Sequence, residues 1–484
     1  DHPLLHGITE EIPYFANQER LTFARVGKIN PLDLNDYQVN GGLSGLKNAL
    51  SMQPSEIVDI IKNSGLRGRG GAGFPTGIKW ETAGAQPKGQ KYICGNPRKN
   101  NPITVKLLKE SLNWKLILDP ELEFPEAYMR NEIIIENATM KEFLMDLVRN
   151  LGRNEITTAG AIIKRFYQAY RTFTNFNLVG KSKKNVEHHY DIGGSRGEKL
   201  YDMFLDKKHR LYSCAYWKEG TKTLEEAQQN KIDHIIKKLD IKEGEKVLEV
   251  GCGWGGMAFE IARQKGCEIT GISLSKNQIE YCKKKAKELG LDNQVKFELI
   301  DYREIDGKYD KIYSVGMFEH VGRKFYNTFF KSMNKLLKEN GIFLLHTIGV
   351  VDKPTPANRF INKYIFPGGI CPSLSQIINP IEKTGLIVSD IETLIRHYDK
   401  TLESWLERFL AKKNLVKDLF DEKFVKMWEF YLASCAAAFR YRDLAVFQLQ
   451  IVKNFQSAHR TRDYICLLYT SDAADDTPCV DLGG

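Results

Sequence analysis

A glycine-rich turn between an expected strand and an expected helix constrains the fold of this chain more than any other feature. Residues 246–256 read K-V-L-E-V-G-C-G-W-G-G, so a short apolar run precedes four glycines. Such a run suits a buried strand of a parallel sheet, and glycines let the backbone turn tightly and approach a ligand. Good helix formers follow at residues 257–264. A strand, a glycine turn and a helix in this order are typical of a nucleotide-binding pocket.

Two kinds of nucleotide site compete for this turn, and a tight turn without any ligand is the third alternative. The glycines satisfy G-x-G-x-x-G, the pattern of a dinucleotide site. Such a site needs an acid at the end of the next strand to bind the ribose. The strand expected at residues 267–272 instead runs into Ser273, Leu274 and Ser275. Glu249 completes E-x-G-x-G-x-G, which resembles the S-adenosylmethionine (SAM) methyltransferases and favours SAM as the ligand.

A regular alternation of strands and helices surrounds the turn. Further strands are predicted at residues 295–300, 311–315, 342–348 and 444–452, and helices at 224–239, 276–289, 324–337, 399–411 and 421–443. This alternation predicts an α/β fold with a doubly wound, Rossmann-like sheet that binds ligands at the carboxyl ends of its strands. An insertion at residues 350–372 is rich in proline, glycine and aromatic residues, and we expect it to act as a lid.

Composition limits the location and the partners of the protein. The 484 residues carry a net charge of +9, which permits an anionic partner without requiring one. The nine cysteines form no C-x-x-C pair, which argues against a zinc site and fits reduced thiols in the cytoplasm. No apolar run is long enough to span a membrane. We expect a cytoplasmic protein, peripheral at the inner face of the membrane, that binds no nucleic acid and can form a homodimer.

The first part of the chain has a different character. Residues 65–77 read G-L-R-G-R-G-G-A-G-F-P-T-G, in which bare amide groups and two arginines could bind a phosphate. This stretch resembles the flavin mononucleotide loop of the NADH-binding subunit of respiratory complex I and of related hydrogenases. The acidic motif that follows in that family is absent here. Residues 1–90 therefore resemble a truncated flavin- and NADH-binding fragment, and an FMN/NADH oxidoreductase fragment is one alternative function.

The end of the chain also differs from the rest. Residues 466–476 read C-L-L-Y-T-S-D-A-A-D-D, which resembles one translated frame of a sequencing adapter. We therefore expect a chimeric gene model whose join lies between residues 87 and 97. The expected parts are the fragment 1–90, a smaller α+β N-terminal domain at 97–185, a methyltransferase domain at 186–455 and an unstructured tail at 456–484. A basic and aromatic helix expected at residues 158–175 could lie on an anionic membrane surface.

Several motifs outside the glycine turn support one family. They are Y-S-C-A-Y-W at residues 212–217, S-L-S-K-N-Q at 273–278, D-Y-R at 301–303, G-M-F-E-H at 316–320, L-H-T-I-G at 345–349 and S-C-A-A-A-F-R at 434–440. With these motifs, residues 97–455 resemble the cyclopropane-fatty-acyl-phospholipid synthase family. The resemblance implies methyl transfer from SAM to a cis double bond of a phospholipid acyl chain at a bilayer surface. A cyclopropane ring would then form through a carbocation that bound bicarbonate deprotonates. A methyltransferase for an amine or another small acceptor is the alternative.

The same resemblance implies the residues of the site. The catalytic residues would be Cys214, Glu319, His346, the N–H of Ile348, Tyr398 and Cys435, of which the first five would bind bicarbonate. Nothing in the mechanism requires a thiol nucleophile, so Cys435 can equally be structural. The residues that hold SAM would be Tyr212, Ser213, Glu249, Gly251, Gly253, Trp254, Gly255, Ser273, Ser275, Asn277, Gln278, Tyr302 and Arg303. The aromatic candidates to stabilise a carbocation are Phe318, Phe325, Tyr326, Trp405 and Phe439, each of which is also an ordinary core residue.

Overall fold

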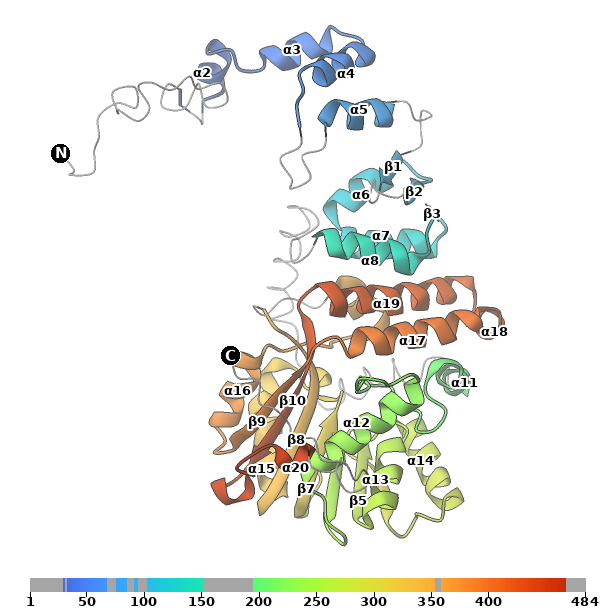
Figure 1. Ribbon diagram of the computed structural model, residues 1–484, viewed down its shortest axis with the longest axis vertical. Coiled ribbons are helices and arrows are strands. Elements are labelled where there is room, and N and C mark those ends of the chain that lie inside the picture. Colours follow the sequence, from blue (N-terminus) through green and yellow to red (C-terminus); the bar gives the residue numbers. More distant parts are fainter. Residues whose placement is uncertain are drawn as a thin grey trace, which may run out of the picture. The chain divides into compact units, whose positions relative to one another are not determined.

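The computed structural model describes residues 29–30, 33–67, 75–84, 91–94, 102–151, 195–352 and 358–466. The chain forms two compact units, Asp1–Tyr92 and Ile93–Gly484 (Figure 1). The helix expected at residues 158–175 and most of the glycine-rich stretch at 65–77 lie outside the described residues.

The first unit consists of short helices without an apolar core in its described part. The helices are α2 (Leu34–Val39), α3 (Ser44–Leu50), α4 (Pro54–Asn63) and α5 (Thr76–Gly84). The first three of these helices bury no side chain. Leu34, Val39 and Leu50 are instead largely exposed. A unit of this kind gains little of the apolar burial that stabilises a domain.

The second unit is built on a seven-stranded sheet. Its strands are β4 (Lys246–Val250), β5 (Glu268–Ser273), β6 (Val295–Leu299), β7 (Tyr309–Val315), β8 (Leu337–Val350), β9 (Ile387–Leu394) and β10 (Leu444–Val452). Their order is β6-β5-β4-β7-β8-β10-β9, and β10 is antiparallel to both of its neighbours. β4 is parallel to β5 on one side and to β7 on the other. The winding of the sheet therefore reverses at β4, where such sheets bind their ligands.

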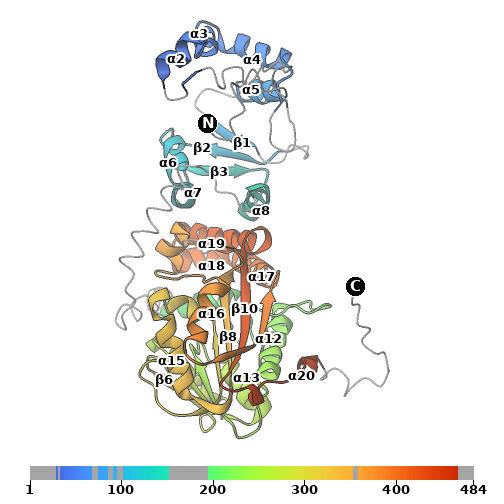
Figure 2. The same cartoon turned by 90° about the vertical axis from the view of Figure 1, so that its left-hand side faces the viewer.

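Helices cover both faces of this sheet (Figure 2). One face packs against α12 (Leu224–Leu239), α13 (Gly256–Lys265) and α14 (Lys276–Glu288), and the other against α15 (Tyr326–Leu336) and α16 (Leu374–Glu382). Val247 belongs to the first core and Leu248 to the second, as the alternation of side chains along a strand requires. The predicted doubly wound α/β fold is confirmed.

The sequence prediction missed two elements of this domain. No strand was predicted between residues 372 and 444, yet β9 lies at the sheet edge, and α16 precedes it. β9 carries Asp390 and Glu392 within I-V-S-D-I-E-T-L, and acids are uncommon in strands. Both acids lie beside Lys238 of α12, a distant partner that the local sequence does not show, and the strand pairs with β10.

A helical layer joins the sheet domain to a smaller α+β region, so that one apolar core runs through both. The layer contains α11 (Ser195–Phe204), α17 (Tyr398–Ala411), α18 (Lys413–Leu419) and α19 (Glu422–Tyr441). The small region contains β2 (Thr104–Leu107), α6 (Leu112–Leu118), α7 (Pro120–Met129), β3 (Ile133–Glu136) and α8 (Met140–Leu151), and β1 (Lys91–Cys94) lies at the boundary with the first unit. The Tyr128 hydroxyl donates to Glu429 on α19 over 2.9 Å.

The insertion expected to act as a lid is attached to the small region. Lys363 and Tyr364 both donate to Glu126 of α7, over 2.6 and 2.9 Å. At its other end, the amide of Ile370 donates to the carbonyl of Glu319 over 2.9 Å. The described part of the insertion therefore connects α7 to the segment that carries a predicted catalytic residue.

The predicted unstructured tail begins too early. After β10 the chain forms the short helices η4 (Phe455–Ser457) and α20 (Asp463–Cys466). Arg462 pairs with Asp390, and the Tyr464 hydroxyl accepts a hydrogen bond from Gln450 over 2.8 Å. The chain therefore still contacts β9 and β10 at Arg462 and Tyr464.

Candidate active site

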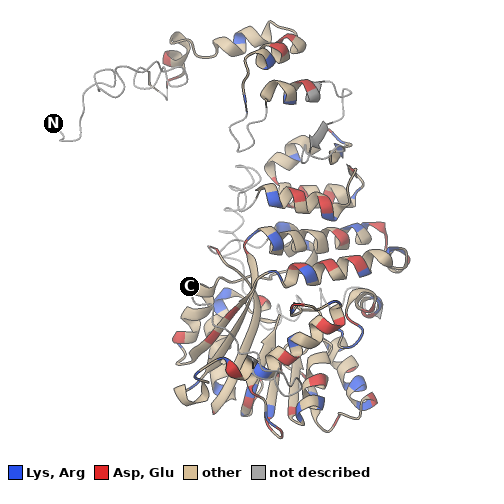
Figure 3. Cartoon of the chain, viewed as in Figure 1, with Lys and Arg blue, Asp and Glu red and all other residues tan. Residues whose placement is uncertain are grey.

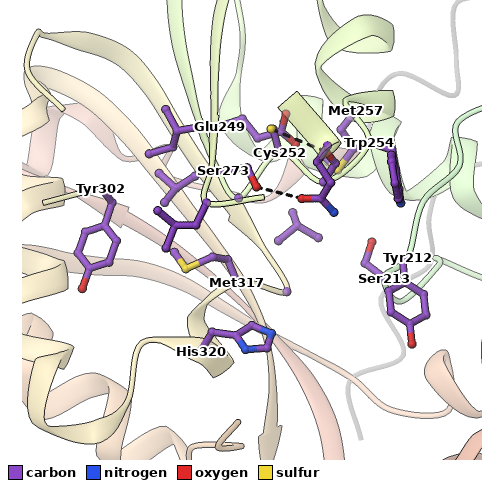
Figure 4. Close-up of a pocket in the computed structure, with 18 of the residues that line it drawn as sticks. Tyr212, Ser213, Glu249, Cys252, Trp254, Met257, Ser273, Tyr302, Met317 and His320 are labelled. Atoms are coloured by element: carbon purple, nitrogen blue, oxygen red, sulfur yellow. Dashed lines mark hydrogen bonds between the residues drawn. The ribbon is translucent and has the colours of Figure 1, made fainter. Parts of the chain in front are cut away.

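A pocket opens at the carboxyl ends of β4, β5, β6 and β7, where the fold predicts a ligand site (Figure 4). Its lining residues come from the segment before α12, from the glycine turn and from the loops after the following strands. They are Arg210, Leu211, Tyr212, Ser213, Glu249, Val250, Gly251, Cys252, Gly253, Trp254, Met257, Ile272, Ser273, Leu274, Gln278, Ile300, Asp301, Tyr302, Arg303, Val315, Gly316, Met317, His320 and Val321.

The glycines of the turn do two different tasks. Gly251 and Gly253 line the pocket in left-handed conformations, with φ of +91° and +52°. Gly255 and Gly256 do not line it. A Cβ atom on Gly255 would lie 2.9 Å from the Phe259 ring, and one on Gly256 would lie 1.8 Å from the carbonyl oxygen of His209. Gly255 packs beneath the turn, and its contact with SAM stays a prediction.

A buried carboxylate shapes the segment that packs on the turn. Asp206 accepts hydrogen bonds from the amides of His209, Arg210 and Leu211, over 2.6, 3.1 and 2.7 Å. These bonds hold the backbone just before Tyr212, whose hydroxyl shares a 2.7 Å hydrogen bond with that of Tyr431 on α19. Gly256 leaves room for this segment, because a Cβ atom there would collide with the carbonyl oxygen of His209.

Several buried polar groups in the pocket wall, Nε1 of Trp254 among them, have no hydrogen-bond partner among the described residues. Oε2 of Glu249 and Nε2 of Gln278 lie buried without a hydrogen bond among the described residues. Burial raises the pKa of Glu249 well above its usual range, and the charge of Lys231 offsets only part of this effect. Gln278 is oriented by the Ser273 hydroxyl, which donates to its Oε1 over 2.9 Å (Figure 4). Buried polar groups without partners are costly, so this wall fits a polar ligand.

The residues at the end of β6 form a rigid charged corner. Arg303 makes two 2.7 Å hydrogen bonds to Asp301, which is itself buried. Bidentate pairing of this kind fixes both side chains. Tyr302 lies between them in the sequence, and burial raises the pKa of its hydroxyl to about 12, so the hydroxyl keeps its proton.

Two more predicted SAM residues lie outside the pocket lining. Ser275 is the N-cap of α14, and its hydroxyl accepts from the amide of Gln278 over 3.3 Å. Asn277 is the second residue of that helix. The motif at residues 273–278 therefore combines residues that line the pocket with residues that start a helix, and the SAM contacts of Ser275 and Asn277 stay predictions.

The lining also includes residues that the sequence prediction left out. The Arg210 guanidinium lies over the rings of Trp254 and Tyr281, at 4.1 and 4.7 Å from their centroids. Met317 and His320 were noted only as parts of a motif, and burial lowers the pKa of His320 to about 4, so it is neutral. The motif at residues 316–320 was a sufficient signal for the last two, whereas Arg210 had none.

A second cluster, of buried polar side chains, forms near the carboxyl end of β8. Glu319 is buried in the 3-10 helix after β7, and its Oε1 accepts from the amide of Ile348 over 2.5 Å. Its Oε2 has no partner among the described residues. Burial raises the pKa of Glu319 to about 7, although the Ile348 amide offsets part of the shift. The expected free amide of Ile348 is therefore engaged by Glu319, so an anion would have to share it.

His346 lies two residues before Ile348 on β8 and faces β10. Its Nδ1 is 3.0 Å from the side-chain nitrogen of Gln448, the residue directly opposite on β10. With the amide in this orientation, the ring proton is on Nε2, which makes that atom a donor. Burial lowers the pKa of His346 well below its usual range, so the ring is neutral. Gln448 was not predicted, and no local signal marks it.

Of the remaining predicted catalytic residues, Tyr398 and Cys435 lie in the helical layer and Cys214 lies in the segment before α12. Cys214 is buried with its thiol 3.3 Å from the Ala215 carbonyl oxygen, and burial raises its pKa. Tyr398 begins α17, and its ring lies 4.7 Å from that of Phe439. Burial raises the pKa of Cys435 to about 12, so it is a thiol and not a nucleophilic thiolate.

Ion pairs give the arginine of the motif at residues 434–440 a structural role. Charges of both signs occur along α17 and α19 (Figure 3). Arg440 pairs with Asp399 at 2.8 Å and with Glu403 at 2.5 Å, and Arg396 also pairs with Asp399 at 2.8 Å. These pairs fasten α19 to the first turns of α17, which carries Tyr398.

The aromatic candidates divide into two groups. Phe318 stacks on Tyr326 at 4.4 Å within the core between the sheet and α15, and Phe325 packs against this core. Trp405 lies 5.1 Å from Tyr212, in the same apolar cluster as Phe439. None of the five candidates lines the described pocket, although the Arg303 guanidinium lies over the Phe325 ring at 5.7 Å and Trp405 and Phe439 are near Tyr212 and Tyr398.

The described residues contain no group of three His, Cys, Asp or Glu side chains that could hold a metal. Within the same residues, no helix is both long and apolar enough to cross a membrane.

Comparison with known proteins identifies relatives over the second unit. The profile of the family described as mycolic acid cyclopropane synthetase matches residues 179–449. Cyclopropane-fatty-acyl-phospholipid synthase of Escherichia coli (strain K12) is 40% identical over 287 residues, which cover 59% of this chain and 72% of that protein. A probable fatty acid methyltransferase of Pseudomonas putida is 38% identical over 281 residues, covering 57% and 70%. The structure of mycolic acid cyclopropane synthase CmaA1 with SAH and CTAB aligns with a TM-score of 0.52 at 32% identity, covering 56% of this chain and 97% of that one.

Proposed function

The chain belongs to the mycolic acid cyclopropane synthetase family and is a SAM-dependent lipid methyltransferase, and on this premise we propose its acceptor and its base. The proposed acceptor is a cis double bond within a phospholipid acyl chain, which becomes a cyclopropane ring. The relative from Escherichia coli, named for a phospholipid product, supports this acceptor. Because the acceptor lies within a bilayer, we expect the protein to act at a membrane surface.

The pocket at the glycine turn fits SAM. Gly251 and Gly253 allow the close approach of a ligand, and the unpartnered groups of Glu249 and Gln278 can bind its polar atoms. Tyr212 and Ser213 would hold the amino-acid end, whereas Ser273, Gln278, Tyr302 and Arg303 would hold the ribose and adenine. When bound, SAM supplies an electrophilic methyl group on a cationic sulfur. The neutral His320 adds no positive charge that would oppose this cation.

The acceptor side must exclude water. An alkene is a weak nucleophile, and water would quench the carbocation that follows methyl transfer. Trp405 is fully buried, and with Tyr398 and Phe439 it forms an apolar surface near Tyr212. Aromatic faces of this kind can stabilise a cation without reacting with it.

The observation that supports the proposal most strongly is the half-satisfied carboxylate of Glu319. The Ile348 amide holds one oxygen, and the other is buried without a partner beside the end of β8. We propose that this oxygen accepts the O–H of a bicarbonate ion, to which Nε2 of His346 donates. Bicarbonate held there would supply the base for ring closure, and Glu319 would raise its basicity.

Vesicles of a phospholipid with one cis double bond in each acyl chain, incubated with the protein and SAM, test this proposal. We expect mass spectrometry to show a gain of one methylene per modified chain. Removal of dissolved carbon dioxide should slow the reaction, and added bicarbonate should restore it. No mass gain on the lipid would contradict the acceptor. Turnover that does not respond to bicarbonate would contradict the base and would favour a small acceptor such as an amine.

A further inference from the structure

A buried lysine next to the pocket forms no ion pair with any described residue. Lys231 on α12 is fully buried, and its ammonium donates to the hydroxyl oxygen of Ser213 over 2.7 Å. In the described parts of the chain, no carboxylate lies within 4 Å of this ammonium. Burial lowers the pKa of Lys231 to about 8, and the charges of Asp206 and Glu249 offset only part of that shift. A buried cation without an ion pair is costly, so a ligand is expected to supply the missing charge.

A second buried lysine on the same helix is paired with acids, as buried lysines usually are. Lys238 is also almost fully buried, two turns along α12. Its ammonium pairs with Glu392 and lies 3.8 Å from Asp390, both on β9. The two lysines therefore share a helix and a degree of burial but differ in having an acidic partner. The one that lacks it is the one beside the pocket.

The hydrogen bond from Lys231 determines what Ser213 can do. An ammonium only donates, so the Ser213 oxygen must accept, and its own proton must point elsewhere. Ser213 lines the pocket, and its carbonyl is held by the side chain of Gln228 over 3.0 Å. The Ser213 hydroxyl is thereby made a hydrogen-bond donor for an acceptor in the pocket. The Lys231 charge behind it favours an acceptor that is an anion.

Glu249, an acid, also lines the pocket. Its Oε2 is buried without a hydrogen-bond partner among the described residues. The acid Glu249 and the Ser213 hydroxyl, which Lys231 orients as a donor, together complement a zwitterion. The ammonium of the zwitterion would bind Glu249, and its carboxylate would bind Ser213. We propose that Lys231 is a positioning residue that turns the Ser213 hydroxyl toward the carboxylate of SAM and neutralises that carboxylate. This inference rests on the placement of SAM given under the proposed function.

The test compares two methyl donors that differ only in the carboxylate. Binding of SAM and of decarboxylated SAM is measured by calorimetry for the full chain, for Lys231→Met and for the control Lys238→Met. Methionine keeps most of the volume of lysine and removes the charge. Lys231→Met should bind SAM about 10- to 100-fold more weakly, as expected when a hydrogen bond to a charged group is lost. Its affinity for decarboxylated SAM should change less than about twofold, and Lys238→Met should bind both donors as the unmodified protein does.

Ser213→Ala separates this inference from the placement of SAM. We expect Ser213→Ala to weaken SAM binding alone, and the double variant with Lys231→Met to add little further loss, because both act through one contact. If Ser213→Ala weakens binding and Lys231→Met does not, the role of Lys231 is wrong and the placement stands. If neither does, the placement itself is wrong. Equal losses for both donors would show a purely structural lysine. If Lys231→Met changes the bicarbonate requirement and leaves the SAM affinity unchanged, the anion that Lys231 neutralises is not the carboxylate of SAM.

Discussion

The pocket proposed for SAM and the cluster around Glu319 lie at the same edge of one sheet but depend on different kinds of group. Backbone shapes the pocket: Gly251 and Gly253 line it in left-handed conformations, and a Cβ atom on Gly256 would meet the carbonyl oxygen of His209. The cluster consists of buried titratable side chains, with Glu319 held by one amide and His346 by Gln448. The amide of Gly316, which donates to the carbonyl of His346 over 3.0 Å, connects the two regions.

This difference predicts which kind of change should impair each region. A pocket made of close backbone contacts is sensitive to added atoms, because the neighbouring chain must move to admit them. A cluster of buried ionisable groups is sensitive to protonation and to the loss of one partner. Changes in the pocket should therefore affect donor binding, and changes in the cluster should affect turnover. The following predictions test this separation.

The largest effect is expected for Glu319→Gln. The amide keeps the shape of the side chain but cannot carry the charge that accepts the bicarbonate O–H. Turnover should fall about 10²- to 10⁴-fold, the usual contribution of acid–base assistance. The affinity for SAM, measured by calorimetry, should stay within about twofold. A matching loss of SAM affinity would mean that the two regions are not separable.

The pH dependence of turnover should follow the same carboxyl group. Because burial raises the pKa of Glu319 to about 7, activity should rise with pH up to about 7 and then level off. In Glu319→Gln, the rise of activity with pH up to about 7 should be absent.

The same shift affects stability in the opposite sense. The folded protein retains a proton on Glu319 that the unfolded chain releases near its ordinary value of 4.5. The unfolding free energy should therefore decrease between pH 4.5 and about 7, by at most about 3 kcal/mol, relative to Glu319→Gln. Urea titrations of both proteins at several pH values measure this difference. A difference that does not vary with pH would contradict the raised pKa.

Gly256→Ala should mainly impair donor binding. The new Cβ atom would lie 1.8 Å from the carbonyl oxygen of His209, so the segment that carries Tyr212 and Ser213 must shift. We expect about 1–3 kcal/mol of destabilisation and about tenfold weaker SAM binding. Gly290→Ala is the control, because that glycine has φ of +66° and no atom within 4 Å of the added Cβ. It should cost about 1 kcal/mol of stability and leave SAM binding unchanged.

Gln448→Leu should have a smaller effect on the cluster. Without the amide, the Nδ1 atom of His346 loses its partner and the ring tautomer is no longer fixed. We expect turnover to fall about tenfold and the bicarbonate concentration for half-maximal rate to rise, as for other positioning residues around a catalytic group. Gln448→Glu, which can still pair with the ring, is the informative comparison. Equal losses in both variants would argue against control of the tautomer.

Removal of residues 1–92 should have the smallest effect. All residues named in the pocket and in the cluster belong to the second unit, and the described helices α2, α3 and α4 bury no side chain. We expect turnover and SAM affinity within about twofold of the full chain, since few contacts would be lost. A large loss would show that the first unit contributes to the enzyme.

The sequence was informative where the residues that form a site are also neighbours along the chain. The strand, turn and helix at the glycines were predicted because the apolar run and the glycines are adjacent, and the structure places Gly251 and Gly253 in the pocket. The same adjacency grouped Gly255 and Ser275 with the residues that line the pocket, although neither lines it. One packs under the turn and the other caps a helix, so a motif does not distinguish a ligand contact from the support beneath it.

The sequence by itself determined the fold class, the family and the edge of the sheet at which the chemistry lies, because hydrophobic periodicity and short motifs are local properties. Only the tertiary structure decided which buried groups have partners. Gln448 faces His346 across 102 positions of sequence, and Lys238 has acids on β9 whereas Lys231 has none among the described residues. The reason is physical: the state of a buried polar group depends on what surrounds it in space, and that surrounding is assembled from distant segments.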